Sequence, residues 1–145
     1  MAVTFTNNWK NILDKLRNTL RTEFGNALPV YVGHESKNVA SQYLRLDPQG
    51  STLLEYASHS ETREFSINFL YYSAYKDIER NALDSVLRIV SRVEALIHDN
   101  ITLTLTDSTK AYDCKLESAE FNTEDEEEKY VVTWDFNCKH TGNTA

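Results

Sequence analysis

The feature that most constrains the fold is the alternation of apolar and polar residues in two segments, 63–72 and 129–140. Neighbouring residues of a β-strand point to opposite faces, so this alternation places the apolar side chains of each segment on one face. A sheet with one apolar face must be covered there by a second layer. The apolar positions are Phe65, Ile67, Phe69 and Tyr71 in the first segment and Tyr130, Val132, Trp134, Phe136 and Cys138 in the second.

Two amphipathic helices are predicted to form that second layer. Apolar residues recur at helical spacing over residues 9–24 and again over 77–98, which gives each segment a single apolar stripe. Polar side chains at residues 6–8 can cap the first helix, and Gly25 suits a left-handed turn at its end. Asn100 is expected to end the second helix in the same left-handed conformation.

Further strands are predicted between and after the helices. The sequence LPVYVG forms one, and QYLRL and STLLEYAS form a hairpin around DPQG, whose residues suit a type I turn. ITLTLT and KAYDCKLESAEF supply two more. The expected fold is therefore one α+β domain over residues 1–145, with two layers. In it, two main helices pack on one face of a largely antiparallel or mixed sheet.

The last two strands should form a hairpin with an acidic tip at residues 122–129 and a flexible tail at 141–145. A hairpin that folds near the middle of the tip brings Cys114 almost opposite Cys138, and Leu116 near Phe136. The acidic tip cannot enter a core, because buried carboxylates without partners are costly. Its charged residues are Glu124, Asp125, Glu126, Glu127 and Glu128.

Composition excludes several classes of protein. The formal net charge of −7 argues against a protein that neutralises nucleic-acid phosphates. Two cysteines are too few for a disulfide scaffold. We also expect neither a signal peptide nor a membrane helix, since no stretch approaches the ~20 apolar residues that a membrane span needs. These features favour a soluble protein of a reducing cytoplasm.

No motif for catalysis, cofactor binding or metal binding stands out. The four histidines are scattered, and no H-E-x-x-H or paired C-x-x-C occurs. Cys138 and His140 share a strand face, which we interpret as an inward thiol and an exposed histidine. Arg88 and Arg92 lie four residues apart and are expected on the solvated edge of the second helix. The sequence thus predicts a protein that is not an enzyme and has no cofactor.

Candidate interaction residues come from tyrosines and from one polar loop. Strands whose second face is uncharged invite pairing between subunits, and tyrosine is enriched at interfaces. The loop GHESKNVAS is expected to contact a neighbouring subunit or another partner. The candidates are His34, Glu35, Lys37, Tyr43, Tyr56 and Tyr72.

Over roughly residues 9–140, the order of these elements resembles the tail terminator (tail completion) proteins of long-tailed bacteriophages. The resemblance rests on the leading helix, LPVYVG, a hairpin, the strand REFSINFLYYS, the helix IERNALDSVLRIVSRVEALI and the closing strands that end in YVVTWDFNCKH. It implies a hexameric ring of identical chains that caps the tail tube, stops its polymerisation and offers a surface to the head–tail connector. DNA would pass through the ring without specific binding. The ring would sit at the head-proximal end of the virion tail after assembly in the host cytoplasm.

Other functions stay open from the sequence. One is another head–tail joining protein or a tail tube protein. A second is a small cone-shaped α+β enzyme, with Asp113 or Asp135 as its base. A third is an acidic immunity-type protein or antitoxin that binds a basic toxin through residues 124–128. Within a ring, the acidic tip would repel DNA if it faced the hole, and would serve solubility if it faced outward.

Overall fold

The computed structural model describes residues 7–25, 28–33, 42–73, 79–124 and 129–143. Six strands form one mixed sheet in the order β1-β2-β3-β6-β5-β4, and only the pair β1–β2 is parallel. This architecture fits the α+β class that the sequence predicted. The elements are α1 (Asn8–Phe24), β1 (Val30–Val32), β2 (Gln42–Ala57), β3 (Ser60–Ser73), α2 (Glu79–Asp99), β4 (Leu103–Thr104), β5 (Lys110–Glu124) and β6 (Lys129–Asn143).

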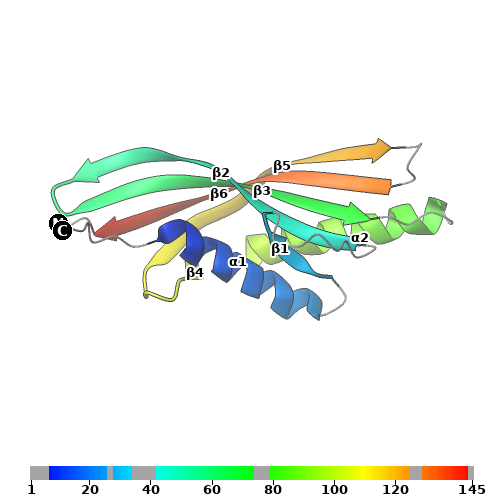
Figure 1. Ribbon diagram of the computed structural model, residues 1–145, viewed down its shortest axis with the longest axis horizontal. Helices are drawn as coiled ribbons and strands as arrows, with labels where there is room; N and C mark the ends of the chain where they lie inside the picture. The colour runs from blue at the N-terminus through cyan, green and yellow to red at the C-terminus, as the bar shows by residue number, and fades with distance from the viewer. Residues whose placement is uncertain (1–6, 26–27, 34–41, 74–78, 125–128, 144–145) are drawn as a thin grey trace.

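The sheet is long and narrow, because its four main strands have 14 to 16 residues each. Figure 1 shows both helices below the sheet, with the outer ends of β2, β3 and β6 running past them on the left. The end of β5 and the start of β6 lie at the opposite end of the molecule. Parts of the sheet therefore extend away from the core.

The core lies on one face of the sheet, as the alternation predicted. Phe65 and Tyr71 of β3 are register partners of Cys138 and Val132 of β6, and all four side chains are buried. Trp9 of α1 meets the ring of Phe65 edge-on, with centroids 4.8 Å apart.

The second helix reaches the same buried face through a polar contact. Trp134 of β6 is 1% exposed, and its indole Nε1 donates a hydrogen bond to Glu94 of α2 over 3.3 Å. A buried indole N–H normally needs such a partner. Side chains from both helices thus contact the face that carries the alternating apolar residues.

The helix ends follow local chemistry with one exception. Asn7 caps α1, accepting a hydrogen bond from the Lys10 amide over 3.1 Å, and Gly25 adopts φ +62° at the other end. The prediction of a left-handed Asn100 is wrong, because the described non-glycine residues with positive φ are Ser108 and Asp113. Asn100 instead closes α2 with its side chain, which donates to the carbonyl of Leu96 over 2.8 Å.

The predicted hairpin around DPQG is also wrong. β2 runs straight through this sequence and stays paired with β3 from Gln42 to Ala57, with register shifts between Pro48 and Gly50 and between Leu53 and Glu55. The proline is tolerated because this part of β2 lies at the edge of the sheet, where a missing N–H need not break a ladder. The chain reverses at residues 58–59 instead. Continuous pairing with β3 therefore prevails over the local turn signal.

The closing strands extend further than expected at one end. Asn143 of β6 pairs with Ser60, so residues 141–143 belong to the strand rather than to a flexible tail. At the other end, β5 and β6 pair up to Glu124 and Lys129, as a hairpin requires. The tip residues 125–128 lie outside the described residues.

Candidate functional site

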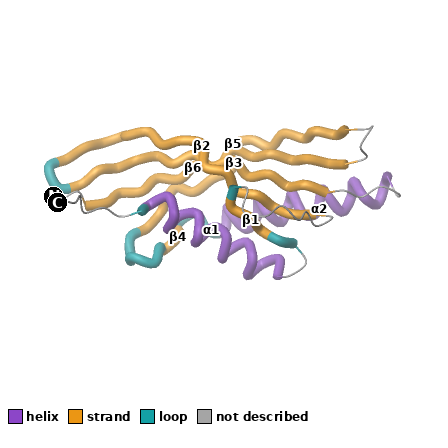
Figure 2. Tube along the Cα trace, viewed as in Figure 1, coloured by secondary structure: helices purple, strands orange, loops and turns teal. Residues whose placement is uncertain are grey.

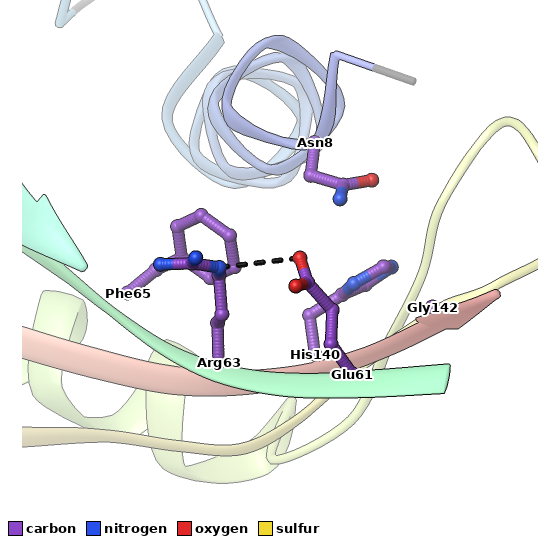
Figure 3. Close-up of a pocket in the computed structure, with 6 residues that line it drawn as sticks. All are labelled: Asn8, Glu61, Arg63, Phe65, His140 and Gly142. Atoms are coloured by element: carbon purple, nitrogen blue, oxygen red, sulfur yellow. Dashed lines mark hydrogen bonds and ion pairs between the residues drawn. The ribbon is translucent and has the colours of Figure 1, made fainter. Parts of the chain in front are cut away.

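A small polar cavity, of about 30 Å³, lies between the start of α1 and the sheet (Figure 3). This volume holds little more than a water molecule. Within it, the Arg63 Nε lies 3.2 Å from Oε1 of Glu61, so these two charges pair with each other. The lining residues are Asn8, Glu61, Arg63, Phe65, His140 and Gly142.

His140 closes this cavity, and the prediction that it is exposed is wrong. The side chain is 3% exposed, and its Nε2 lies 2.9 Å from the Thr109 Oγ1. The Thr109 hydroxyl donates to the carboxylate of Asp107, so it accepts from the N–H of His140. Burial lowers the pKa of His140, while Asp107 and Glu61 act in the opposite sense. The hydroxyl proton points away from the imidazole, which is the wrong arrangement for a base that activates a nucleophile.

The two cysteines meet as the sequence predicted. Both are buried, and the interaction of the Cys138 thiol with the Cys114 side chain, together with burial, raises the pKa of Cys138. Leu116 is the register partner of Phe136, also as predicted. A raised pKa keeps the thiol protonated, whereas nucleophilic cysteines are thiolates. The pair therefore acts as core packing.

The acidic residues considered as bases do not face a cavity. Asp113 is exposed and pairs with Lys139 over 3.2 Å. Asp135 is exposed and accepts a hydrogen bond from Ser118 over 3.1 Å. In the described ranges, no group of three His, Cys, Asp or Glu residues could hold a metal ion, and no helix has the length and apolar character of a membrane span.

Two of the tyrosines predicted at an interface lie together. Tyr43 and Tyr72 are register partners on β2 and β3, and their rings stack with centroids 5.0 Å apart at 27°. Tyr31 of β1 extends the row, with its centroid 5.8 Å from that of Tyr43. Since their chain neighbours Leu44 and Tyr71 are buried, the row lies on the face opposite the core. Tyr31 was not among the residues predicted from the sequence, although its place between Val30 and Val32 indicated that it lies on the face opposite these two valines.

The third tyrosine predicted at an interface lies elsewhere. Tyr56 is 68% exposed and sits 13 residues further along β2, which corresponds to roughly 40 Å. The predicted tyrosines therefore belong to two separate surfaces. The other candidates, His34, Glu35 and Lys37, lie outside the described residues.

The outer part of β2 is the most exposed strand segment in the described structure. All ten residues from 48 to 57 are exposed, including Leu53 at 46% and Leu54 at 48%. In the described sheet, β1 pairs only with residues 44–46, so the outer edge of this segment has no strand partner. An edge strand with exposed leucines is a template for pairing with another chain. We call residues 48–57 the β2 edge.

A second edge lies on β5. β4 pairs only with Lys110 and Ala111, so residues 115–124 have no strand partner on their outer side among the described elements. Phe121 is 45% exposed there. We call residues 115–124 the β5 edge. Figures 1 and 2 show the two edges at opposite ends of the molecule, and the strand order places them on opposite sides of the sheet.

No family model matches the chain, and no curated protein matches its sequence. The fold is nevertheless found in solved structures. One is a chain from the virion of a native gene transfer agent particle, with a TM-score of 0.61, 13% identity, and coverage of 95% of this chain and 100% of that chain. Another, which carries no descriptive name, has a TM-score of 0.60, 17% identity, and coverage of 94% and 97%. The chain therefore shares its whole fold with these two structures.

Proposed function

We propose that this chain is a structural virion protein that caps the phage tail tube as a ring of six identical copies. The ring stops tube polymerisation and provides the surface to which the head–tail connector attaches. Its place is the head-proximal end of the tail, and it assembles in the host cytoplasm. The partners are other copies of the chain, the tail tube protein and the connector protein.

The exposed β2 edge is the observation that carries this proposal. A strand with ten exposed residues and apolar side chains at Leu53, Leu54 and Tyr56 is a liability for a protein that remains alone. In a ring of identical copies, each edge is covered by a neighbour. The fold supports the same conclusion, because it matches a virion chain over the full length of that chain.

The buried and half-buried polar groups around the small cavity and the cysteine pair also fit a structural role. The proton of the Thr109 hydroxyl is directed to Asp107, the thiol of Cys138 is held protonated, and Glu61 pairs with Arg63. These groups satisfy one another and leave no activated nucleophile among them. The chain would act through shape and repetition.

The charge of the chain suits a ring through which DNA passes. Each copy carries a formal charge of −7, so six copies would repel the DNA backbone rather than retain it. The acidic run from Glu124 to Glu128 begins at the last residue of β5. They would increase this repulsion if they faced the hole.

Sedimentation velocity and native mass measurement, with and without purified tail tubes, test the proposal. We expect a closed oligomer whose mass is six times that of the chain, and electron micrographs with one ring on a tube end. A protein that stays monomeric and never binds tube ends would overturn the proposal. Polymerisation of the chain into open tubes would also overturn it and would favour a tail tube protein.

Two matched variants connect the ring to the β2 edge. Leu53→Lys combined with Leu54→Lys places charges on the edge and should abolish the oligomer. Leu87→Lys alters a similarly exposed leucine, 42% exposed on α2, and should leave the oligomer intact. If the Leu53 and Leu54 changes leave the oligomer unaffected, this edge is not its contact.

A further inference from the structure

We propose that the β2 edge of one copy pairs antiparallel with the β5 edge of the next, so that one sheet continues from copy to copy. This inference rests on the proposed ring and names its contact. The occupant of the β2 edge is thus a second copy of this chain. Four observations support the pairing.

The first observation is the position of the edges. They lie on opposite sides of the sheet and at opposite ends of an elongated molecule (Figure 1). A contact between them joins two different surfaces of the chain, which is a heterologous contact, and contacts of this kind form rings when the rotation closes. Each overlap would be roughly 30 Å long for ten paired residues.

The second observation is strand direction. β2 is antiparallel to β3, β3 to β6, and β6 to β5, so β2 and β5 run in opposite directions within one copy. Two copies in the same orientation therefore present β2 and β5 to each other as antiparallel neighbours. Antiparallel strands form slightly more stable pairs than parallel ones.

The third observation is the match between faces. Leu53 and Tyr56 are register partners of Arg63 and Glu61, which share the sheet face of Phe65. On the β5 edge, Phe121 is the partner of the buried Val132 and lies on the same face.

A sheet that continued between copies would therefore gather exposed apolar side chains on its core face. The opposite face would carry polar residues from both edges. On β2 these are Thr52 and Glu55, whose partners are Glu64 and Thr62. On β5 they are Ser118 and Glu120, whose partners are Asp135 and Thr133. The two edges thus have matching apolar and polar sides.

The fourth observation is charge. The β5 edge carries Glu117, Glu120 and Glu124 against a single Lys115, so two β5 edges would place like charges opposite each other. The β2 edge has one charged residue, Glu55. Pairing of β5 with β2 avoids the repulsion that would oppose pairing of β5 with β5.

Cross-linking of single-cysteine variants tests the pairing. Leu53→Cys and Phe121→Cys are made separately, and assembled protein is treated with a flexible bismaleimide, whose reach tolerates small differences in register. The native cysteines Cys114 and Cys138 are both buried, and unsubstituted protein measures their background. We expect a covalent dimer in the mixture of the two variants, and none with either variant alone. Leu87→Cys mixed with each variant is the control, and no dimer is expected from it.

A chain with both substitutions, Leu53→Cys and Phe121→Cys, should give a ladder of covalent oligomers that ends at the mass of the ring. Rings without any cross-link would overturn the edge pairing and leave the proposed function standing. A dimer from Leu53→Cys alone would show a symmetric contact and would also overturn the pairing. Protein that stays monomeric even with tail tubes would overturn both the pairing and the ring.

Discussion

His140 and Thr109 are joined by a hydrogen bond of 2.9 Å between the imidazole Nε2 and the hydroxyl oxygen, and the imidazole is buried. The bond connects the end of β6 to the turn before β5. Because Thr109 donates to Asp107, the neutral imidazole donates to Thr109. Protonation would place a positive charge in this buried site, and this has a measurable consequence.

We predict that the unfolding free energy falls as pH drops below about 6.5, the ordinary pKa of histidine. Burial lowers the pKa of His140, so the unfolded chain binds the proton more readily than the folded chain. The contribution of His140 to the unfolding free energy is then fully present above pH 6.5. Below this pH it decreases, by at most about 1.4 kcal/mol per pH unit for one proton. Urea denaturation at pH 7.5 and 5.5 measures the loss.

The variant His140→Gln should remove this part of the pH dependence, whereas His59→Gln, in the exposed turn before β3, should retain it. The lowered pKa of Asp107 affects stability in a separate pH range. The stabilisation that the Asp107 carboxylate contributes is lost only as the pH falls below 3.8, the ordinary pKa of this group. If the unfolding free energy of the His140→Gln variant and of the native protein depended equally on pH, this pH dependence would not come from His140.

A second prediction concerns the Thr109 hydroxyl. Thr109→Val keeps the shape of the side chain and the backbone bond from residue 109 to Asp107, but it removes the two bonds of the hydroxyl and leaves the buried imidazole N–H unsatisfied. We expect a loss of about 1–3 kcal/mol in unfolding free energy. Thr109→Ser should restore most of it, and thermal or urea denaturation distinguishes the two variants. A loss in Thr109→Ser as large as that in Thr109→Val would mean that the hydroxyl bonds alone do not account for the stability of this turn.

A third prediction concerns the stacked tyrosines. A double-mutant cycle of Tyr43→Ala and Tyr72→Ala should give a coupling energy of about 0.5–1.5 kcal/mol, the usual range for aromatic pairs. The pair Tyr56→Ala and Tyr72→Ala is the control, since these residues lie on different surfaces, and it should show additive effects. Urea titrations of the single and double variants supply both cycles. Additivity of Tyr43 and Tyr72 would rule out the contact.

A fourth prediction separates stability from assembly. Ile67→Ala removes a side chain that is 0% exposed and should cost about 2–5 kcal/mol of unfolding free energy. Leu54→Ala removes a side chain that is 48% exposed and should change the unfolding free energy of the single chain by less than about 0.5 kcal/mol. The same Leu54 variant should weaken the oligomer in sedimentation experiments. A large loss of single-chain stability in Leu54→Ala would place this residue in a core instead.

Local pattern was sufficient for much of the fold. The alternation around Phe65 and Trp134 identified the buried face of the sheet, because a strand has a fixed period of two. Gly25 marked the end of the first helix, because glycine readily adopts the positive φ that is common after the last turn of a helix. The contact between Cys114 and Cys138 followed from counting residues along one hairpin.

Interactions between segments that are distant in the sequence decided the parts of the fold that local pattern did not predict. Pro48 and Gly50 signal a turn, yet pairing with β3 keeps β2 extended there. His140 is buried because Thr109 and Glu61, distant in sequence, enclose it. Likewise, Tyr43 stacks with Tyr72 and is separated from Tyr56 only because β2 is one straight strand.

The sequence by itself determined which apolar faces enter the core and most of the helical and strand segments, since these depend on periodicity along the chain. Only the tertiary structure decided which strand edges remain exposed, because exposure of an edge depends on where every other strand ends. β1 and β4 are short and leave the β2 and β5 edges uncovered in the described sheet. No local pattern in either edge records how far a neighbouring strand reaches.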